Sequence, residues 1–310
     1  MKRIAKIPII AALCGALLLS GCDNGNSVPS EIVVSGESSD VGESYFPASS
    51  CGVTLEKAVE KAVSLSPAAT EIICELGFQS ALVGVSSYCD YPTTLSAAKV
   101  GSTENPDINR IIGLKPDAVI TLSALSEREI YALNQAGIAV LTAPVPTNME
   151  EYSALYREIS AAFYGKEQTD SEKGIAKSAQ IGRDARSALE KASGEVKLGS
   201  YIYITGKLTI AGANTFENAV LSLSGENICK ESGYIAREDF KVPETAPEYL
   251  IADSSLTYAD ITSSGILSSF LENGSKLRYV SSRCFERPTA RTAEVFTEIT
   301  NPETSEPTEE

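Results

Sequence analysis

Short apolar runs alternate with amphipathic segments along residues 59–146. The runs are continuous, which is typical of strands buried on both faces of a parallel sheet. The predicted strands are AVSLSP (62–67), ALVGV (81–85), AVITLS (118–123) and IAVLTAPV (138–145). Three helices are predicted between these strands. The first begins at Ser66-Pro67 and ends at Gly77, the second lies within 106–117, and the third spans 126–137. This alternation of strand and helix predicts an α/β lobe.

Residues 197–300 repeat the scheme. The predicted strands are SYIYIT (200–205), EYLIADSS (248–255) and LRYVSS (277–282), and the predicted helices are TFENAVLSLSGE (215–226) and SGILSSFLENG (264–274). We therefore predict an α/β fold of two Rossmann-like lobes, each with a central, mainly parallel sheet. The first lobe covers residues 53–148 and the second covers residues 197–300.

The segment 149–196 between the lobes has apolar positions at helical spacing and no proline. We predict a single long helix that joins the lobes as a stiff strut. Gly174 and Gly182 weaken this helix by about 1 kcal/mol each relative to alanine. The alternative is two ordinary helices within one domain.

The N-terminus has the pattern of a targeting segment. Three bases precede an apolar stretch, Ile9 to Leu19, that is too short to be a typical membrane-spanning helix. The sequence Leu-Ser-Gly-Cys ending at Cys22 resembles the lipobox of bacterial lipoproteins, which implies a signal peptide at 1–21 and a lipid on Cys22. The alternative is an ordinary signal peptide with a chance cysteine. No other stretch is apolar enough to span a membrane, so Cys22 is the expected anchor.

Two acidic segments flank the globular part. Residues 22–52 are rich in Ser, Gly, Asp and Glu, which predicts a flexible tether, and residues 301–310 predict a disordered tail. The net charge is −15, and ten acids with no base lie in 23–52 and 298–310. The remainder is mildly acidic, so nucleic acid is excluded as a partner.

The chain contains no histidine. This excludes Ser-His-Asp and Cys-His catalysis and histidine-based metal sites. Phosphate-binding glycine motifs are also absent. We expect no enzyme, no catalytic residue, no metal site and no cofactor; an enzyme on a similar scaffold is an alternative that a measured turnover would support. Five cysteines outside the N-terminal segment lack CxxC spacing, and their pairing stays open: Cys51, Cys74, Cys89, Cys229 and Cys284.

Two similar loops follow predicted strands, one in each lobe. SSYCDYP (86–92) comes after the run 81–85, and SSRCFERP (281–288) contains the end of LRYVSS. Ligands of open α/β sheets bind beyond the carboxyl ends of strands. The two loops therefore predict opposite walls of one cleft. Tyr88 offers a flat apolar face and a hydroxyl to a large ligand, and Pro92 restricts its loop.

Several ordered segments resemble the helical-backbone (class III) substrate-binding proteins of ABC importers, which take up corrinoids such as vitamin B12, ferric siderophores or haem. The matching segments are Val63–Glu71, Gly84–Pro92, Leu114–Asp117, Gly225–Ile228 and Phe285–Pro288. The resemblance extends over nearly all of 60–297. It implies a monomer with two lobes joined by one long backbone helix and a ligand held between them. It also implies delivery to a membrane permease powered by an ATPase.

Within that family, SSYxDYP and the Phe-Glu-Arg segment look most like the cobalamin-binding branch. The resemblance implies corrin contacts at Tyr88 and in the loop 283–287. Together with the residues placed at strand ends, the candidate ligand contacts are Tyr88, Asp90, Tyr91, Ser66, Thr103, Ser123, Arg283, Cys284, Phe285, Glu286 and Arg287. The expected transport ligand is a corrinoid.

The chain departs from that branch at two positions. Arg283-Cys284 stands where cobalamin binders typically have Asp-Trp, and Thr103 lies where an aromatic residue is common. Arg283 with Arg287 favours an anionic ligand instead. A ferric siderophore or haem is therefore the alternative ligand, and a surface protein without a small ligand is the third interpretation.

Family members tend to dock on their permease through one acid on each lobe. In the first lobe the expected position falls near Asn109, which is not acidic, and Asp107 and Glu104 are close substitutes; in the second lobe Glu238 or Asp239 are the candidates. A solvated surface charge is the alternative role for each of them. The predicted location is extracytoplasmic, with the chain anchored to the cell membrane by lipid.

Overall fold

The computed structural model describes residues 45–166 and 174–301. The predicted signal peptide, the lipidated Cys22, nearly all of the tether and residues 302–310 of the tail lie outside the described residues. Within the described ranges, no helix combines the length and the apolar character needed to cross a membrane.

The first lobe is a five-stranded, wholly parallel sheet in the order β5-β4-β3-β6-β7. Its strands are β3 (Ala62–Ser64), β4 (Leu82–Val85), β5 (Ala98–Lys99), β6 (Ala118–Thr121) and β7 (Ala139–Thr142). Its helices are α1 (Pro67–Glu75), η1 (Gln79–Ala81), α2 (Ile108–Leu114) and α3 (Glu127–Gln135). The predicted alternation of strands and helices is confirmed, because all of β3 and β6 is buried, as continuous apolar runs require.

The predicted helix ends are visible in the first lobe. Ser66 caps α1 by accepting from the Ala69 amide, and Pro67 occupies the first turn. Ser126 forms a capping box with Glu129 at the start of α3. These caps place the carboxyl ends of β3 and β6 beside helix N-termini, and that edge of the sheet is where the site forms.

The second lobe is a six-stranded mixed sheet in the order β11-β9-β8-β12-β13, with β10 also paired to β8. Its strands are β8 (Gly199–Ile204), β9 (Thr209–Ala211), β10 (Gly225–Asn227), β11 (Tyr234–Ala236), β12 (Tyr249–Asp253) and β13 (Lys276–Val280). Its helices are α6 (Phe216–Leu221), α7 (Tyr258–Thr262) and α8 (Gly265–Glu272). The parallel core β10, β8, β12 and β13 confirms the prediction, whereas the antiparallel strands β9 and β11 were not predicted.

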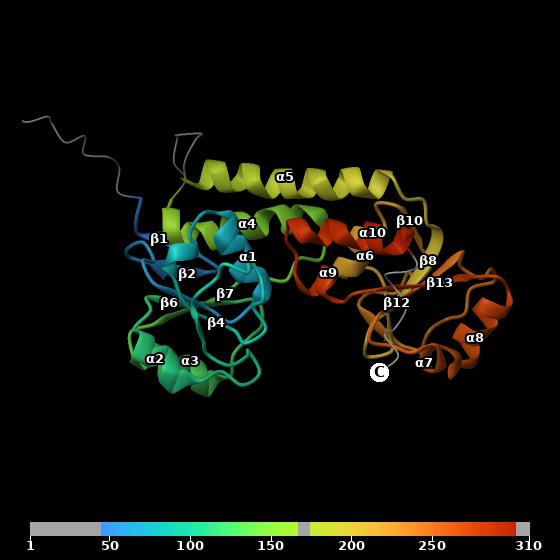
Figure 1. Cartoon of the computed structure of the whole chain (residues 1–310), viewed down its shortest axis with the longest axis horizontal. Helices are drawn as coiled ribbons and strands as arrows, with labels where there is room; N and C mark the ends of the chain where they lie inside the picture. Colours follow the sequence, from blue (N-terminus) through green and yellow to red (C-terminus); the bar gives the residue numbers. More distant parts are fainter. Residues whose placement is uncertain (1–44, 167–173, 302–310) are drawn as a thin grey trace, which may run out of the picture. The chain divides into compact units, whose positions relative to one another are not determined.

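The connecting segment holds two helices, α4 (Met149–Tyr164) and α5 (Gly174–Gly194). The prediction of one helix over all of 149–196 is wrong in extent, because α4 ends at Gly165, whose φ of +80° is outside the helical region. The single helix that leads into β8 is α5, which lies alongside α4 (Figure 1). Gly182 allows this packing, since a Cβ there would lie 2.6 Å from the Ser153 carbonyl oxygen.

The fold includes residues before the predicted boundary at residue 53. Strands β1 (Ala48–Ser50) and β2 (Val53–Leu55) form an antiparallel pair. The Ser50 hydroxyl is fully buried and donates to the Glu158 carbonyl oxygen of α4. The last residues assigned to the tether are therefore part of the fold.

The C-terminal segment after β13 contains α9 (Arg283–Glu286), η2 (Ala290–Ala293) and α10 (Glu294–Thr300). It returns to the first half of the chain, because the Tyr152 hydroxyl of α4 donates to the Thr289 carbonyl oxygen at 2.7 Å. One continuous buried cluster includes Ile72 of α1, Val280 of β13 and Phe296 of α10. This shared core favours a rigid relationship between the two lobes.

Candidate functional site

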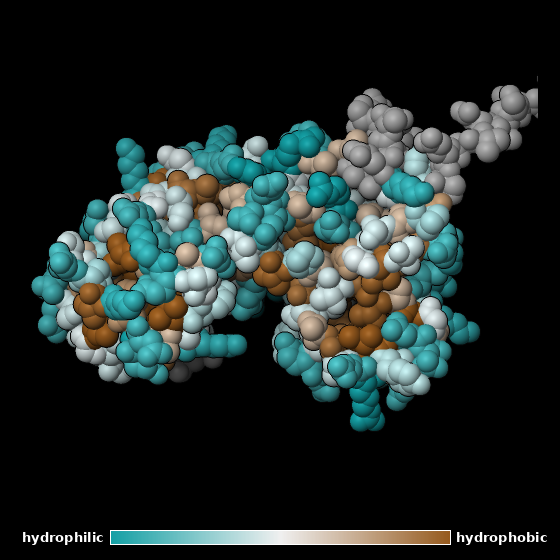
Figure 2. All heavy atoms as spheres, turned by 180° about the vertical axis from the view of Figure 1, so that it is seen from behind, coloured by the Kyte–Doolittle hydropathy of each residue, from teal (hydrophilic) through white to brown (hydrophobic). Residues whose placement is uncertain are grey.

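A cleft of about 720 Å³ lies between the loops at the strand ends of both lobes. The space-filling view shows the molecule hollowed between the lobes (Figure 2). Nine of the residues predicted from the sequence line this cleft: Ser66, Tyr88, Asp90, Thr103, Ser123, Arg283, Phe285, Glu286 and Arg287. The strand-end rule therefore places both predicted loops at one cavity.

Two of the predicted contact residues do not line the cleft. The Tyr91 ring lies under the Arg291 guanidinium, 4.8 Å from ring centroid to carbon. Cys284 is buried, and its thiol lies 3.8 Å from a carboxylate oxygen of Glu298 on α10. Burial raises the pKa of that thiol to about 12. Tyr91 was included as part of the SSYCDYP loop, and Cys284 because the resemblance implies contacts from the loop 283–287. Neighbouring side chains of a short turn point in different directions.

Tyr88 presents its ring to the cleft while its backbone is fixed. Tyr88 is 65% exposed. The Tyr88 amide donates to the Ser86 hydroxyl, and its carbonyl oxygen accepts from Arg287. The Lys99 ammonium donates to the carbonyl oxygens of Ser86 and Cys89, which fixes the loop from below. A large exposed ring on an ordered loop loses little entropy when it contacts a ligand.

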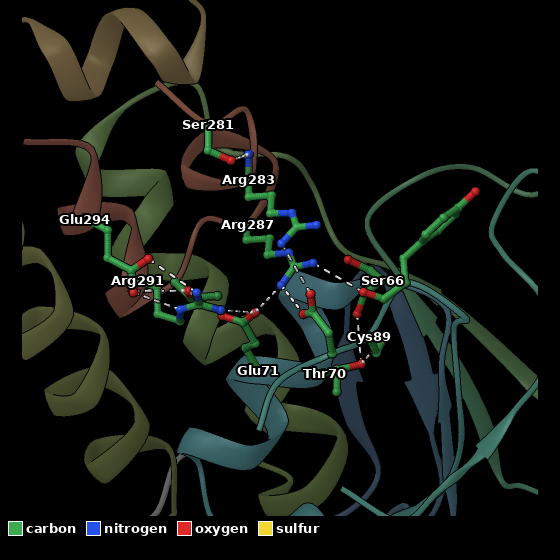
Figure 3. Close-up of polar contacts among 12 residues, drawn as sticks. Ser66, Thr70, Glu71, Cys89, Ser281, Arg283, Arg287, Arg291 and Glu294 are labelled. Carbon is green, nitrogen blue, oxygen red and sulfur yellow. Dashed lines mark hydrogen bonds and ion pairs between the residues drawn. The ribbon is translucent and has the colours of Figure 1, made fainter. Parts of the chain in front are cut away.

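Arg287 joins the second-lobe loop to the first lobe. One guanidinium nitrogen lies 2.5 Å from Asp90 Oδ1 and 3.1 Å from Glu71 Oε1. Figure 3 shows Arg287 and Arg291 reaching Glu71 of α1 from opposite sides. The hydrogen bond from Arg287 holds the pKa of Asp90 below its usual value. Arg287 is therefore a paired cation and contributes little net positive charge to the cleft.

Glu71 was not predicted as a site residue. It is 1% exposed, and its second carboxylate oxygen accepts from the Thr289 hydroxyl at 2.9 Å. Full burial of a carboxylate is costly unless it is paired, which explains its two arginine partners. The available signal was an acid within the apolar helix PAATEIIC, where a solvent-facing position is not expected.

Arg283, unlike Arg287, is exposed and weakly paired. Its side chain is 68% exposed and makes one long ion pair with Asp90 at 3.7 Å. Such exposed pairs contribute little stability. Arg283 is therefore a cation that remains available to a ligand.

Hydroxyl groups form the first-lobe floor of the cleft. Ser66 is occupied as the cap of α1, and the Thr103 hydroxyl donates to the Leu65 carbonyl oxygen at 2.8 Å. The Ser123 amide donates to the Thr121 hydroxyl. These contacts order the floor, and the Ser66 hydroxyl serves as the N-cap of α1 while the residue lines the cleft.

The sequence did not identify the second-lobe wall made by Phe216, Glu217 and Tyr234. The Tyr234 hydroxyl donates to both oxygens of Glu217 at 3.1 and 3.0 Å. Burial raises the pKa of Glu217 above its usual value. Thr215, which caps α6, was the available signal, because it predicts that the start of this helix lies at the strand ends.

Residues 63–272 match the family model described as periplasmic binding protein. The chain belongs to the periplasmic binding protein family. Among the curated relatives, it is 28% identical over 273 residues to an ABC transporter substrate-binding lipoprotein of Bacillus subtilis, with 81% of each chain covered. It is 26% identical over 230 residues to a cobalamin-binding protein of Halobacterium salinarum, covering 71% of this chain and 61% of that one.

Solved structures of periplasmic binding proteins share this fold. The vitamin B12-binding protein of Vibrio cholerae aligns with a TM-score of 0.55 at 22% identity, covering 78% of this chain and 95% of that one. A possible iron-binding protein of Staphylococcus epidermidis aligns with a TM-score of 0.62 at 20% identity, covering 77% and 96%. The class III architecture predicted from the sequence is therefore confirmed.

The acids predicted to dock this periplasmic binding protein on a permease are exposed. Asp107 caps α2 by accepting from the Arg110 amide at 3.0 Å. Glu238 and Asp239 follow β11 in the second lobe. None of the three lines the cleft, so a change at these positions is separable from a change in ligand binding.

Proposed function

We propose that this periplasmic binding protein captures a corrinoid in the cleft between its lobes and delivers it to an ABC permease powered by an ATPase. The protein acts as an extracytoplasmic monomer. A signal peptide at 1–21 directs export, and a lipid on Cys22 anchors the chain to the membrane.

The pairing of Arg287 is the observation that favours a corrinoid over an anionic chelate. Arg283 and Arg287 together favoured an anionic chelate, but Arg287 is bound to two carboxylates. The cleft lining contains four acids, Asp90, Glu104, Glu217 and Glu286, against these two arginines, and one of the acids, Asp90, is a partner of Arg287. An excess of carboxylates disfavours a polyanionic ferric catecholate. A corrinoid with neutral amide arms avoids that repulsion.

The apolar part of the lining supports the same ligand. Tyr88, Phe216 and Phe285 contribute aromatic side chains from both lobes. A large flat ring system buries its faces against such residues, while its polar edges contact the acids and hydroxyls. The naming of several curated relatives as cobalamin-binding or vitamin B12-binding proteins supports this proposal.

Haem is the second candidate, favoured by the exposed Tyr88 and Arg283, which both line the cleft. A tyrosinate is a known axial ligand of haem iron, and a free arginine suits a propionate. Haem ligation by tyrosine changes the visible absorption of haem, so a spectral titration distinguishes this candidate from corrinoid binding.

Titration calorimetry of the full-length chain tests the proposal. The ligands are cyanocobalamin, cobinamide, haem and a panel of ferric siderophores. The variant is Tyr88→Ala, and the matched control is Tyr131→Ala, which removes an equally exposed tyrosine of α3 outside the cleft. We expect sub-micromolar corrinoid binding that only Tyr88→Ala weakens. Tight binding of an anionic iron chelate alone would overturn the corrinoid proposal.

A further inference from the structure

A second cavity of about 590 Å³ lies within the second lobe and adjoins the cleft. We call it the second-lobe recess. It lies at the carboxyl ends of β8 and β12. It shares four lining residues with the cleft, namely Glu217, Tyr234, Phe285 and Glu286. A ligand in the cleft therefore lies next to the recess.

Tyr203 of β8 lines the recess with a hydroxyl that lacks a partner. The residue is 2% exposed, and its ring contacts Phe285 edge-on at 4.9 Å between centroids. Its hydroxyl makes no hydrogen bond to any residue in the described ranges. Burial raises its pKa strongly, and the charges of Asp253 and Glu217 add to this effect. The hydroxyl is not sealed from solvent and its residue lines the recess, so it is a neutral donor that a ligand can reach.

Asp253 lines the recess, and only one of its two carboxylate oxygens accepts a hydrogen bond from the described residues. The residue is 3% exposed, and Oδ1 accepts from the Ser255 amide at 2.8 Å. Oδ2 takes part in no hydrogen bond or ion pair with the described residues. This oxygen is not sealed from solvent and its residue lines the recess, so a donor group of a ligand can bind it.

The charges of the recess define what it accepts. Its lining contains three acids, Glu217, Asp253 and Glu286, and one base, the exposed Lys207. A carboxylate arm is repelled by this lining. A primary carboxamide is neutral and offers both a donating NH2 group and an accepting oxygen. It matches the free acceptor of Asp253 and the free donor of Tyr203.

We propose that the second-lobe recess binds a primary carboxamide arm of the transported ligand, whose NH2 group donates to Asp253 and whose oxygen accepts from Tyr203. This inference rests on the proposed corrinoid function. It makes Tyr203 and Asp253 specificity-determining residues, and it explains how a binding protein without tryptophan recognises the edge of its ligand.

Calorimetry with two corrinoids that share ring, cobalt and cyanide ligands tests the inference. Dicyanocobinamide carries carboxamide arms, and dicyanocobyrinic acid carries carboxylates in their place. We expect the unaltered full-length chain to prefer dicyanocobinamide. Tyr203→Phe and Asp253→Asn should each weaken its binding about tenfold, the loss of one buried hydrogen bond. The matched control Tyr201→Phe removes a hydroxyl of the same strand that bonds Ser222 outside the recess, and should leave affinity unchanged.

Glu286→Gln is a second variant that does not disturb the core, because Glu286 is exposed. It should raise the affinity for dicyanocobyrinic acid, since it removes one repelling charge. If Tyr203→Phe binds dicyanocobinamide as the unaltered chain does while Tyr88→Ala weakens it, the recess inference is wrong and the corrinoid function stands. If Asp253→Asn alone weakens binding, a cation is recognised and the carboxamide assignment is wrong. If the unaltered chain binds neither corrinoid, both proposals fail.

Discussion

Glu71 and Arg287 are 216 residues apart in sequence and form a buried ion pair at 3.1 Å. Glu71 lies in the first helix of the first lobe, and Arg287 lies in the loop after the last strand of the second. The same guanidinium holds Asp90 at the cleft. Arg287 therefore joins the two lobes and, through Asp90, also fixes the position of a side chain in the ligand site.

Removal of Arg287 should destabilise the protein strongly. Arg287→Met leaves the Glu71 carboxylate buried with only the more distant Arg291, and we expect a loss of about 3 kcal/mol in the free energy of unfolding. Urea unfolding measures this loss. The control is Arg291→Met, which loses the half-exposed partner Glu294 and only the longer contact with Glu71 at 3.5 Å, so its loss should be smaller. Equal losses in the two variants would show that the Glu71–Arg287 pair has no special role.

Stability should fall in acid through Asp90. The pKa of Asp90 is lowered in the folded state by the hydrogen bond from Arg287, so the folded chain favours the ionised form. This contribution is present above the usual aspartate pKa of about 3.9 and is lost as the pH falls further. Urea unfolding of the unaltered chain and Asp90→Asn across this range measures it. We expect the difference between the two chains to shrink as the pH falls; a constant difference would contradict the prediction.

Glu217→Gln should stabilise the ligand-free protein at neutral pH. Burial raises the pKa of Glu217 in the folded state, so ionisation opposes folding, and the penalty appears as the pH rises through that raised value. Glutamine keeps an acceptor for the Tyr234 hydroxyl and removes the charge. Thermal unfolding should show a higher Tm for the variant at pH 7, and no gain at a pH below the usual glutamate pKa of about 4.3. A lower Tm at pH 7 would mean that the Tyr234 bond outweighs the cost of burial.

Gly182→Ala should destabilise the contact between α4 and α5. Its new Cβ would lie 2.6 Å from the Ser153 carbonyl oxygen, and such overpacking costs about 1–3 kcal/mol. Gly113→Ala is the matched control, because it lies in α2 with no atom within 4 Å of the new Cβ. That variant should gain up to about 1 kcal/mol from helix propensity. Urea unfolding should show changes in the free energy of unfolding that are opposite in sign for the two variants if Gly182 is needed for close packing of α4 and α5.

Loss of the exposed acids should stop transport and spare ligand binding. Asp107→Ser removes the charge but keeps a residue that caps α2, so the fold is retained. We expect this change combined with Glu238→Gln and Asp239→Asn to reduce uptake of the ligand by cells, with calorimetric affinity unchanged. Full uptake by the triple variant would show that these acids are surface charges without a docking role.

The sequence predicted the first lobe well because its strands are buried on both faces and its helices carry strong caps, such as Ser66 and Ser126. The antiparallel strands β9 and β11 have three residues each, too few for a periodic signal. The division of 149–196 into two helices was also missed, because apolar spacing continues on both sides of Gly165. A glycine in a helical pattern does not by itself reveal its φ.

The cleft was predicted in part. Loops after β4 and β13 follow from the strand-end rule, whereas Glu217 and Tyr203 depend on how the mixed sheet is assembled. The pairing of Arg287 with Glu71 was not visible either, since nothing local connects residues so distant in sequence. This pairing changes the interpretation of the ligand, because it removes one of the two arginines that favoured an anion.

The return of the C-terminal segment to α1 has a consequence for biosynthesis. A chain grows from its N-terminus, and domains generally fold in that order. The first lobe cannot form all of its contacts before the C-terminal segment is made, because the partners of its buried Glu71 are Arg287, Thr289 and Arg291. Ribosomes must finish nearly the whole chain before the carboxylate is paired. A chain that terminates before Arg287 therefore has a first lobe whose Glu71 carboxylate lacks all three of these partners.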